Sequence, residues 1–187
     1  DDRGQVRFAV NIFRDVTERM RAELAREFLS NASVALASSL DYETTLENVA
    51  RLAVPTFADM CIFDILTEDG IVRCAVAHRE PERAQALYDL IERVPLDPSS
   101  AHPVARVLRT GQSELATNIE RGGLTLDALE PERAAMLREL GILSTIVVPL
   151  VARGRSIGAL SFIHAESGRQ YTLGDLDLAE EVARRAA

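Results

Sequence analysis

Lysine is absent from this chain, and all 21 of its Lys and Arg positions are arginine. Aspartate and glutamate together number 29, so the formal net charge is −8. An acidic chain lacks the clustered positive charge that nucleic-acid phosphates and anionic lipids attract, so we expect no nucleic-acid partner. The missing lysine itself is interpreted as a consequence of genomic base composition.

Cysteine is scarce as well, with Cys61 and Cys74 as the two. Two cysteines are too few for a disulfide framework or a four-ligand zinc site. No run of roughly 18 consecutive apolar residues occurs, so no membrane insertion is expected. The chain does not begin with methionine and its last residues are helix-forming. We interpret it as a piece of a larger cytoplasmic protein.

What remains is an ordinary globular composition. The 187 residues are 47% hydrophobic and 27% charged, with a mean hydropathy of +0.01. At roughly 100–200 residues per domain, this length indicates one domain with room for part of a neighbour.

Hydrophobic periodicity predicts helices and strands in alternation. Residues 5–13 alternate like a strand, a long helix follows from residue 18, and Asp41 is positioned to cap a second helix that Pro55 ends. Two hairpins are expected from strands at residues 59–66 with 71–78 and 144–151 with 157–164. A brief strand at 113–117 and helices at 81–91, 104–109, after Pro131 and after Thr172 complete the order. Hairpins joined by helical crossovers indicate an α+β domain.

Several short motifs, in order, make the chain from about Phe28 onward resemble a GAF domain, a small-molecule sensor module. They are residues 59–64, Asp69-Gly70, and residues 107–112, 144–150, 156–160 and 171–176. The resemblance implies a central, mostly antiparallel sheet of five to six strands. Terminal helices would cover one face, and crossover helices and loops would cover a pocket on the other.

The beginning of the chain resembles the end of a PAS domain, through the Asp-x-Thr exit within residues 11–19. We therefore expect a PAS remnant at 1–15, a signalling helix at 16–27 and the GAF domain at 28–187. This arrangement is similar to bacterial sensor histidine kinases, which are phosphorelay transferases of two-component systems. Regulators that end in a serine/threonine phosphatase are the alternative. The chain itself is expected to be a regulatory sensor region and not an enzyme.

Strand alternation and the resemblance together predict which side chains line the pocket. They are Ile62, Asp64, Arg133, Met136, Thr145, Val147, Ser161 and Ile163. Asp64 is the most informative, because a carboxylate among apolar neighbours needs a partner or a solvated cavity. Arg133 is its expected partner, and the ligand is an unidentified small molecule. A collapsed cavity in a domain that serves only as a dimerising spacer remains the alternative.

The cysteines and histidines offer other chemistries. Cys61 and Cys74 lie on strands that should pair, which leaves a redox or sulfoxide-reducing enzyme open against simple core packing. His102 is preceded by Ala101, where bilin-binding GAF domains carry a cysteine, so a covalent chromophore is not favoured. None of the three histidines has a partner at metal-ligand spacing, so haem is not favoured either. The cofactor is left unknown, and the lack of lysine counts against a cyclic-nucleotide signature.

An apolar stripe begins the long helix, with Val16, Met20, Leu24 and Phe28 at four-residue spacing. Little of the domain precedes it, so we expect a parallel helix pair, and hence a homodimer through the terminal helices, to bury it. Alternatively, the stripe folds back on the sheet or covers a PAS domain.

Overall fold

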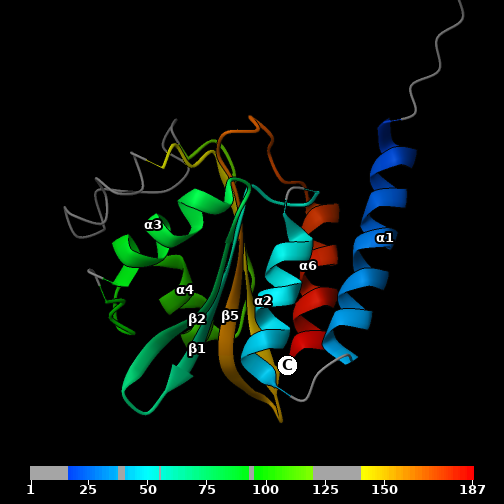
Figure 1. The fold of residues 1–187 in the computed structure, drawn as a ribbon. Helices are drawn as coiled ribbons and strands as arrows, with labels where there is room; N and C mark the ends of the chain where they lie inside the picture. Colours follow the sequence, from blue (N-terminus) through cyan, green and yellow to red (C-terminus); the bar gives the residue numbers. More distant parts are fainter. Residues whose placement is uncertain (1–16, 38–40, 55, 93–94, 120–139) are drawn as a thin grey trace, which may run out of the picture.

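A five-stranded antiparallel sheet forms the centre of the protein (Figure 1). The structure is a computed structural model that describes residues 17–37, 41–54, 56–92, 95–119 and 140–187. The strands lie in the order β2-β1-β5-β4-β3. Their bounds are β1 Met60–Thr67, β2 Gly70–His78, β3 Glu114–Ala116, β4 Ser144–Ala152 and β5 Arg155–His164. The predicted α+β class and mostly antiparallel sheet are confirmed.

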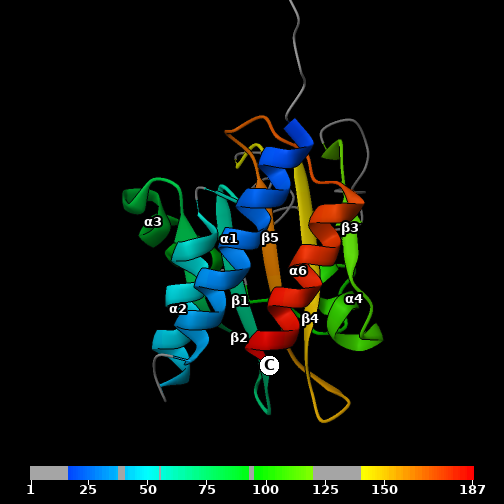
Figure 2. The ribbon, with the colours of Figure 1, turned by 90° about the vertical axis from the view of Figure 1, so that its right-hand side faces the viewer.

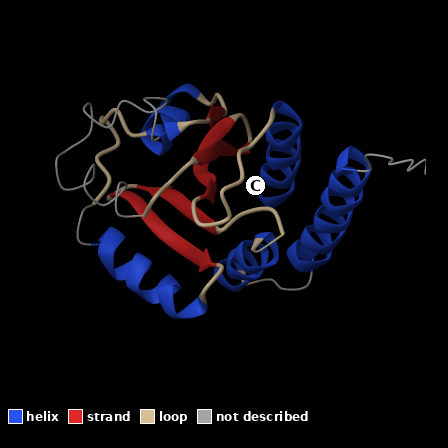
Figure 3. Cartoon of the chain, turned by 90° about the horizontal axis from the view of Figure 1, so that it is seen from above, coloured by secondary structure: helices blue, strands red, loops and turns tan. Residues whose placement is uncertain are grey.

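Helices cover the two faces of the sheet unequally. The helices α2 (Tyr42–Ala53) and α6 (Leu173–Ala186) lie on one face, and α1 (Thr17–Ala37) lies outside them (Figures 2 and 3). The opposite face carries α3 (Pro81–Glu92) and α4 (Pro103–Thr110). The face beneath α1, α2 and α6 is called the helix face below, and the other the pocket face.

Local hydrogen bonds explain where the helices begin. The Asp41 carboxylate accepts from the backbone N–H of Glu43 at 3.1 Å, as the predicted cap of α2. Thr172 and Asp175 form a reciprocal capping box at the start of α6. Such caps satisfy backbone donors that have no partner inside the helix, so a polar residue directly before an apolar period is a strong signal. The predicted cap at Asp41 is confirmed, and the last helix begins after Thr172 as predicted.

The two hairpins also follow from short-range sequence features. Gly70 adopts a φ of +126° at the end of the β1–β2 turn. Arg153 and Gly154 have φ values of 51° and 76° between β4 and β5, as a two-residue hairpin turn requires. Gly158 permits close packing of β5 on β1, because a Cβ built there would lie 2.5 Å from the backbone oxygen of Asp64.

Aromatic rings form the centre of the helix-face core. Phe57 packs edge-on against Phe162 with 4.9 Å between centroids, and Phe28 of α1 stacks on Phe57 at 5.4 Å. Tyr171 joins the cluster and donates from its hydroxyl to the backbone oxygen of Phe57 at 3.1 Å. These contacts attach α1 and the start of α6 to the sheet.

The observed bounds differ from the predicted ones by one or two residues, which is usual for element ends. The expected strand at 5–13 and the helix after Pro131 lie outside the described residues, so the division at residues 15 and 27 stays a prediction. Among the helices that the structure describes, none has both the length and the apolar character to cross a bilayer.

Candidate functional site

Six of the eight predicted pocket residues share one face of the sheet. In the register of β1, β5 and β4, Ile62 lies opposite Ser161, which lies opposite Val147. One row along, Ile163 lies opposite Thr145. Residues directly opposite in an antiparallel pair point to the same side, so the alternation identified a common face. Arg133 and Met136 lie outside the described residues.

Asp64, the sixth, is buried and paired. Its carboxylate is 1% exposed, and its Oδ1 lies 2.8 Å from the Nη2 of Arg73, whose side chain is 12% exposed. A β-bulge produces this pairing, because Phe63 aligns with Ala75 and Asp64 with Arg73, leaving Cys74 as the extra residue. Arg73 on the neighbouring strand is therefore a partner of Asp64, and the predicted partner Arg133 lies outside the described residues.

A cavity of about 200 Å³ lies against this ion pair. It is bounded by β1 and β2 on one side and by α3 and the segment after it on the other. The lining residues are Asp64, Ile71, Val72, Arg73, Tyr88, Pro95 and Leu96. One ion pair within mostly apolar walls is typical of a site for a small organic molecule.

Two polar groups on the pocket face have no hydrogen-bond partner among the described residues. They are the Nε–H of Arg73 and the hydroxyl of Ser161, and Ser161 is only 5% exposed. Buried polar groups in folded proteins are nearly always hydrogen-bonded, and an orphaned one costs about 1–3 kcal/mol. Unsatisfied donors on this face are a property expected of a site that a ligand completes.

Other described residues of the pocket face belong to apolar clusters. Ile62 and Ile163 belong to an apolar cluster with Met60, and Val147 packs with Leu96 and other residues near α4. Among the hollows lined by described residues, the one on this face lies at its Asp64 end.

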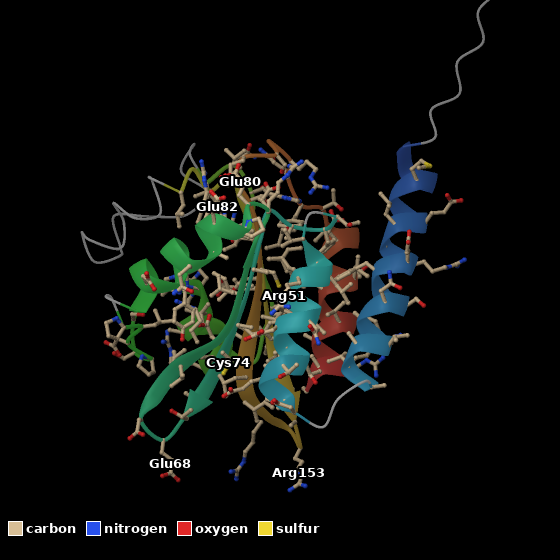
Figure 4. The ribbon with its side chains drawn as sticks, in the orientation of Figure 1. Arg51, Glu68, Cys74, Glu80, Glu82 and Arg153 are labelled. Atoms are coloured by element: carbon tan, nitrogen blue, oxygen red, sulfur yellow. The ribbon has the colours of Figure 1, made fainter. Side chains whose placement is uncertain are left out.

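A second, larger hollow of about 890 Å³ runs along the free edge of β2, between α2 and α3. We call it the edge groove. Figure 4 labels two residues of its wall, Cys74 on β2 and Arg51 on α2. Val72, Arg73 and Tyr88 line both the edge groove and the inner cavity. These three side chains therefore form the shared wall between the two spaces.

The cysteines lie away from the inner cavity. Cys61 is fully buried in the helix-face core, where burial raises the pKa of its thiol far above the ordinary value. Cys61 aligns with Ala77, so Cys74 lies three residues further along β2, roughly 10 Å away by strand geometry. A disulfide requires Cα atoms within about 7 Å. Both thiols are free, and the core-packing interpretation of Cys61 agrees with its position.

The three histidines have structural roles. His102 caps α4 by accepting from the backbone N–H of Val104 at 3.3 Å. His78 accepts from the backbone N–H of Glu80 at 2.9 Å. His164 stacks on Tyr171 at 4.1 Å, and burial lowers its pKa to about 4. Within the described part of the chain, no group of three His, Cys, Asp or Glu side chains is positioned to hold a metal ion.

Asp59, which the sequence analysis did not single out as a site, ties the start of β1 to the end of β5. Its buried carboxylate accepts from the N–H of Ala165 at 2.9 Å and from the hydroxyl of Ser167 at 2.6 Å. Burial raises the pKa of Asp59, but hydrogen bonds from Ser167 and Ala165 outweigh it and lower the net value. Asp59 is a structural clamp where the inner strand β1 begins and the inner strand β5 ends.

The apolar stripe of α1 divides in the structure. Met20 and Leu24 are 50% and 42% exposed, and Val16 lies outside the described residues. Phe28 was predicted to lie in the helix pair with the rest of the stripe. In the structure it is instead 3% exposed and packs on Phe57 and Phe162. The stripe thus folds back onto the core at Phe28, and its other two described members, Met20 and Leu24, remain open to a partner.

Comparisons with known proteins agree on the fold. The chain is similar to the GAF domain of a phosphoenolpyruvate-protein phosphotransferase from Coxiella burnetii, with a TM-score of 0.66 and 15% identity over 88% of this chain and 91% of that one. It is also similar to the A. aeolicus nlh2 GAF domain (TM-score 0.65, 8% identity, 88% and 94% covered). A free methionine-R-sulfoxide reductase from Neisseria meningitidis has a TM-score of 0.64 and 19% identity, with 97% and 92% covered.

Among curated proteins, no sequence matches this chain. The family model described as GAF domain matches residues 39–187, which include α2, all five strands and α6. This match covers well over half of the sequence, and the sheet order and helix placement agree with the similar structures. The chain therefore belongs to the GAF domain family, whose members are typically regulatory sensors.

Proposed function

We propose that this chain is the ligand-sensing region of a cytoplasmic bacterial signalling protein. It binds a small molecule on the pocket face and passes the change to its terminal helices. The observation that carries the proposal is the buried Asp64–Arg73 pair beside a cavity, with an Arg73 N–H that has no partner. A domain that served only as a spacer would gain nothing from such an unsatisfied group, because it destabilises the fold.

The sheet provides a direct mechanical connection between the two faces. Ser161 points to the pocket face, and its neighbour Phe162 points to the helix face, where it contacts Phe28 of α1. A ligand that shifts β5 on one side therefore displaces the aromatic cluster on the other. Packed cores respond to such shifts by changing between discrete arrangements, which α1 and α6 can carry out of the domain.

A homodimer through the terminal helices is part of the proposal. Met20 and Leu24 occupy one side of α1 at four-residue spacing and are half exposed. A second copy of α1 would bury both side chains in a parallel pair. The output module that we propose is a histidine kinase of a two-component system, with a serine/threonine phosphatase module as the alternative.

Native mass spectrometry of the purified chain tests ligand binding. We expect a small-molecule adduct on the wild type and on Arg155→Met, which removes an exposed arginine outside both hollows. The adduct should be lost in Arg73→Lys, which keeps the charge opposite Asp64 but removes the Nε–H donor. Absence of any adduct from the wild type, under conditions where the same spectra preserve non-covalent dimers, contradicts the proposal.

Light scattering tests the dimer. Leu24→Glu should lower the mass from dimer to monomer, because it buries a carboxylate in an apolar interface. Arg26→Glu, at an exposed position of the same helix, is the matched control and should leave the dimer intact. A monomeric wild type, or equal dissociation in both variants, argues against pairing through α1.

A further inference from the structure

The strand β2 lies at one end of the sheet order, and the edge groove runs along its free side. We propose that the edge groove binds an extended peptide segment of a partner protein. The segment adds to the sheet beside β2 and presents a basic side chain to Glu43. This interaction surface goes beyond the proposed ligand site and does not depend on it.

The free edge of β2 offers backbone hydrogen bonds. The N–H of Arg79 donates to the backbone oxygen of Asp59 at 2.8 Å, and the register from there to Ala75 has no shift. Hydrogen-bonded and non-hydrogen-bonded pairs alternate in an antiparallel ladder, so the N–H and C=O of Val76 and His78 point away from β1. No described residue hydrogen-bonds to the outward backbone groups of Val76. An added strand would supply partners for them, as in other cases of strand addition to a sheet edge.

The shape of the edge groove suits one strand. The eight consecutive residues 72–79 line it, together with residues of α2 on the helix face and α3 on the pocket face. At about 3.3 Å per residue, this stretch is roughly 25 Å long. The bulge at Cys74 limits regular pairing to residues 75–78. A single extended segment fits between the two helices, whereas the β2 edge of a second copy would bring its own α2 and α3 against them.

Charge along the groove favours a basic occupant. Each arginine that lines the groove already has a carboxylate partner. The pairs are Arg51 with Glu47 at 2.6 Å, Arg73 with Asp64 at 2.8 Å and Arg79 with Asp59 at 3.6 Å. The exposed carboxylate of Glu43 has no ion pair with a described residue. A positive side chain on the occupant would therefore complement the groove.

The position of Glu43 fits an added strand. Burial, and then the nearby carboxylates of Glu43 and Asp64, raise the pKa of the Cys74 thiol, which places Glu43 beside the middle of β2. Successive side chains of a strand point to opposite faces of the sheet. One side chain of the segment can therefore face Glu43 on the α2 side, while its neighbours face the uncharged α3 side, which includes Pro81 and Ala84.

Three peptides with blocked ends test the proposal in NMR titrations of the labelled full chain. The first is Arg-Val-Thr-Val-Thr-Val, and the second has Glu in place of Arg. The third is the first peptide with alternate amides N-methylated, which removes the donors of one edge. We expect the Arg peptide to bind saturably and shift the Val76 amide, and the Glu peptide to bind at least about threefold more weakly, since an exposed ion pair contributes modestly. Absence of binding by the Arg peptide, or equal binding of the N-methylated peptide, overturns the proposal.

A charge reversal locates the basic residue. Glu43→Arg should reverse the preference between the Arg and Glu peptides. The matched control is Glu68→Arg, an exposed position in the β1–β2 turn that lines neither hollow and should keep the wild-type preference (Figure 4). An unchanged preference in Glu43→Arg contradicts the assigned contact.

A proline tests the backbone pairing. Val76→Pro removes an N–H that faces away from β1, which an edge strand tolerates, and should weaken the Arg peptide by about tenfold or more. Circular dichroism checks that this variant folds, and the result for Glu43→Arg stands without it. Undiminished binding by folded Val76→Pro overturns the strand addition. If light scattering shows a wild-type dimer that Val76→Pro dissociates and Leu24→Glu does not, the occupant is a second copy and the proposed partner is wrong.

Discussion

Replacing Phe28 with alanine tests whether α1 is part of the folded domain. Phe28 is 3% exposed, stacks on Phe57 and meets Phe162 edge-on at 6.4 Å. Removing a buried phenylalanine costs about 3–5 kcal/mol, as lost transfer free energy plus the cavity left behind. Because α1 is the outermost helix and can move inward, we expect the lower end, about 3 kcal/mol.

Such a loss is a large part of the stability of a typical domain. For a chain of this length it corresponds to a fall of about 6–12 °C in the midpoint of thermal unfolding. Urea unfolding followed by circular dichroism measures the free energy, and Met20→Ala is the matched control on the same helix. Because Met20 is half exposed, Met20→Ala should lower the free energy of unfolding of the monomer by less than about 1 kcal/mol. If Phe28→Ala also costs less than about 1 kcal/mol, α1 does not pack as described.

Three further outcomes follow from other parts of the fold. Gly158→Ala should destabilise by about 1–3 kcal/mol in urea, because its Cβ would lie 2.5 Å from the backbone oxygen of Asp64, and an unchanged midpoint would refute that contact. Burial lowers the pKa of His164 to about 4 in the folded protein, whereas its ordinary pKa of 6.5 applies in the unfolded chain. As the pH falls, the unfolded chain therefore takes up a proton at His164 before the folded protein does. Stability should therefore fall as pH drops from about 6.5 to 4, by up to about 3 kcal/mol, and His164→Gln should flatten this slope in urea midpoints across pH. A thiol reagent should modify Cys74 in the native protein and Cys61 only after unfolding, and rapid native reaction of both would contradict the burial of Cys61.

Features controlled by a few adjacent residues were predictable from the sequence. The caps at Asp41 and Thr172 and the Arg153-Gly154 turn depend on local hydrogen bonds and backbone angles, which any tertiary context preserves. Strand alternation has a period of two, so it also showed that Ile62 and Ser161 share a face.

Features that depend on contacts between residues far apart in the sequence were not predictable. Arg73 was missed because a bulge at Cys74 changes which residue of β2 lies opposite Asp64, and nothing in the sequence marks that bulge. Helical spacing places Phe28 and Met20 on one side of α1, but it does not predict that the domain core buries Phe28 and leaves Met20 exposed. The only available signal for Arg73 was a charged residue inside an otherwise apolar strand.

The central claim is that a small molecule binds on the pocket face of the sheet. A methyl NMR spectrum of the labelled chain, recorded before and after adding a filtered low-molecular-mass extract of the expressing cells, tests it most directly. The account predicts shifts at Ile71, which lines the cavity, and at Ile62 and Val147 on the same face. Val182 and Val148 in the helix-face core should shift less. Shifts confined to the helix face, or an unchanged spectrum, would contradict it.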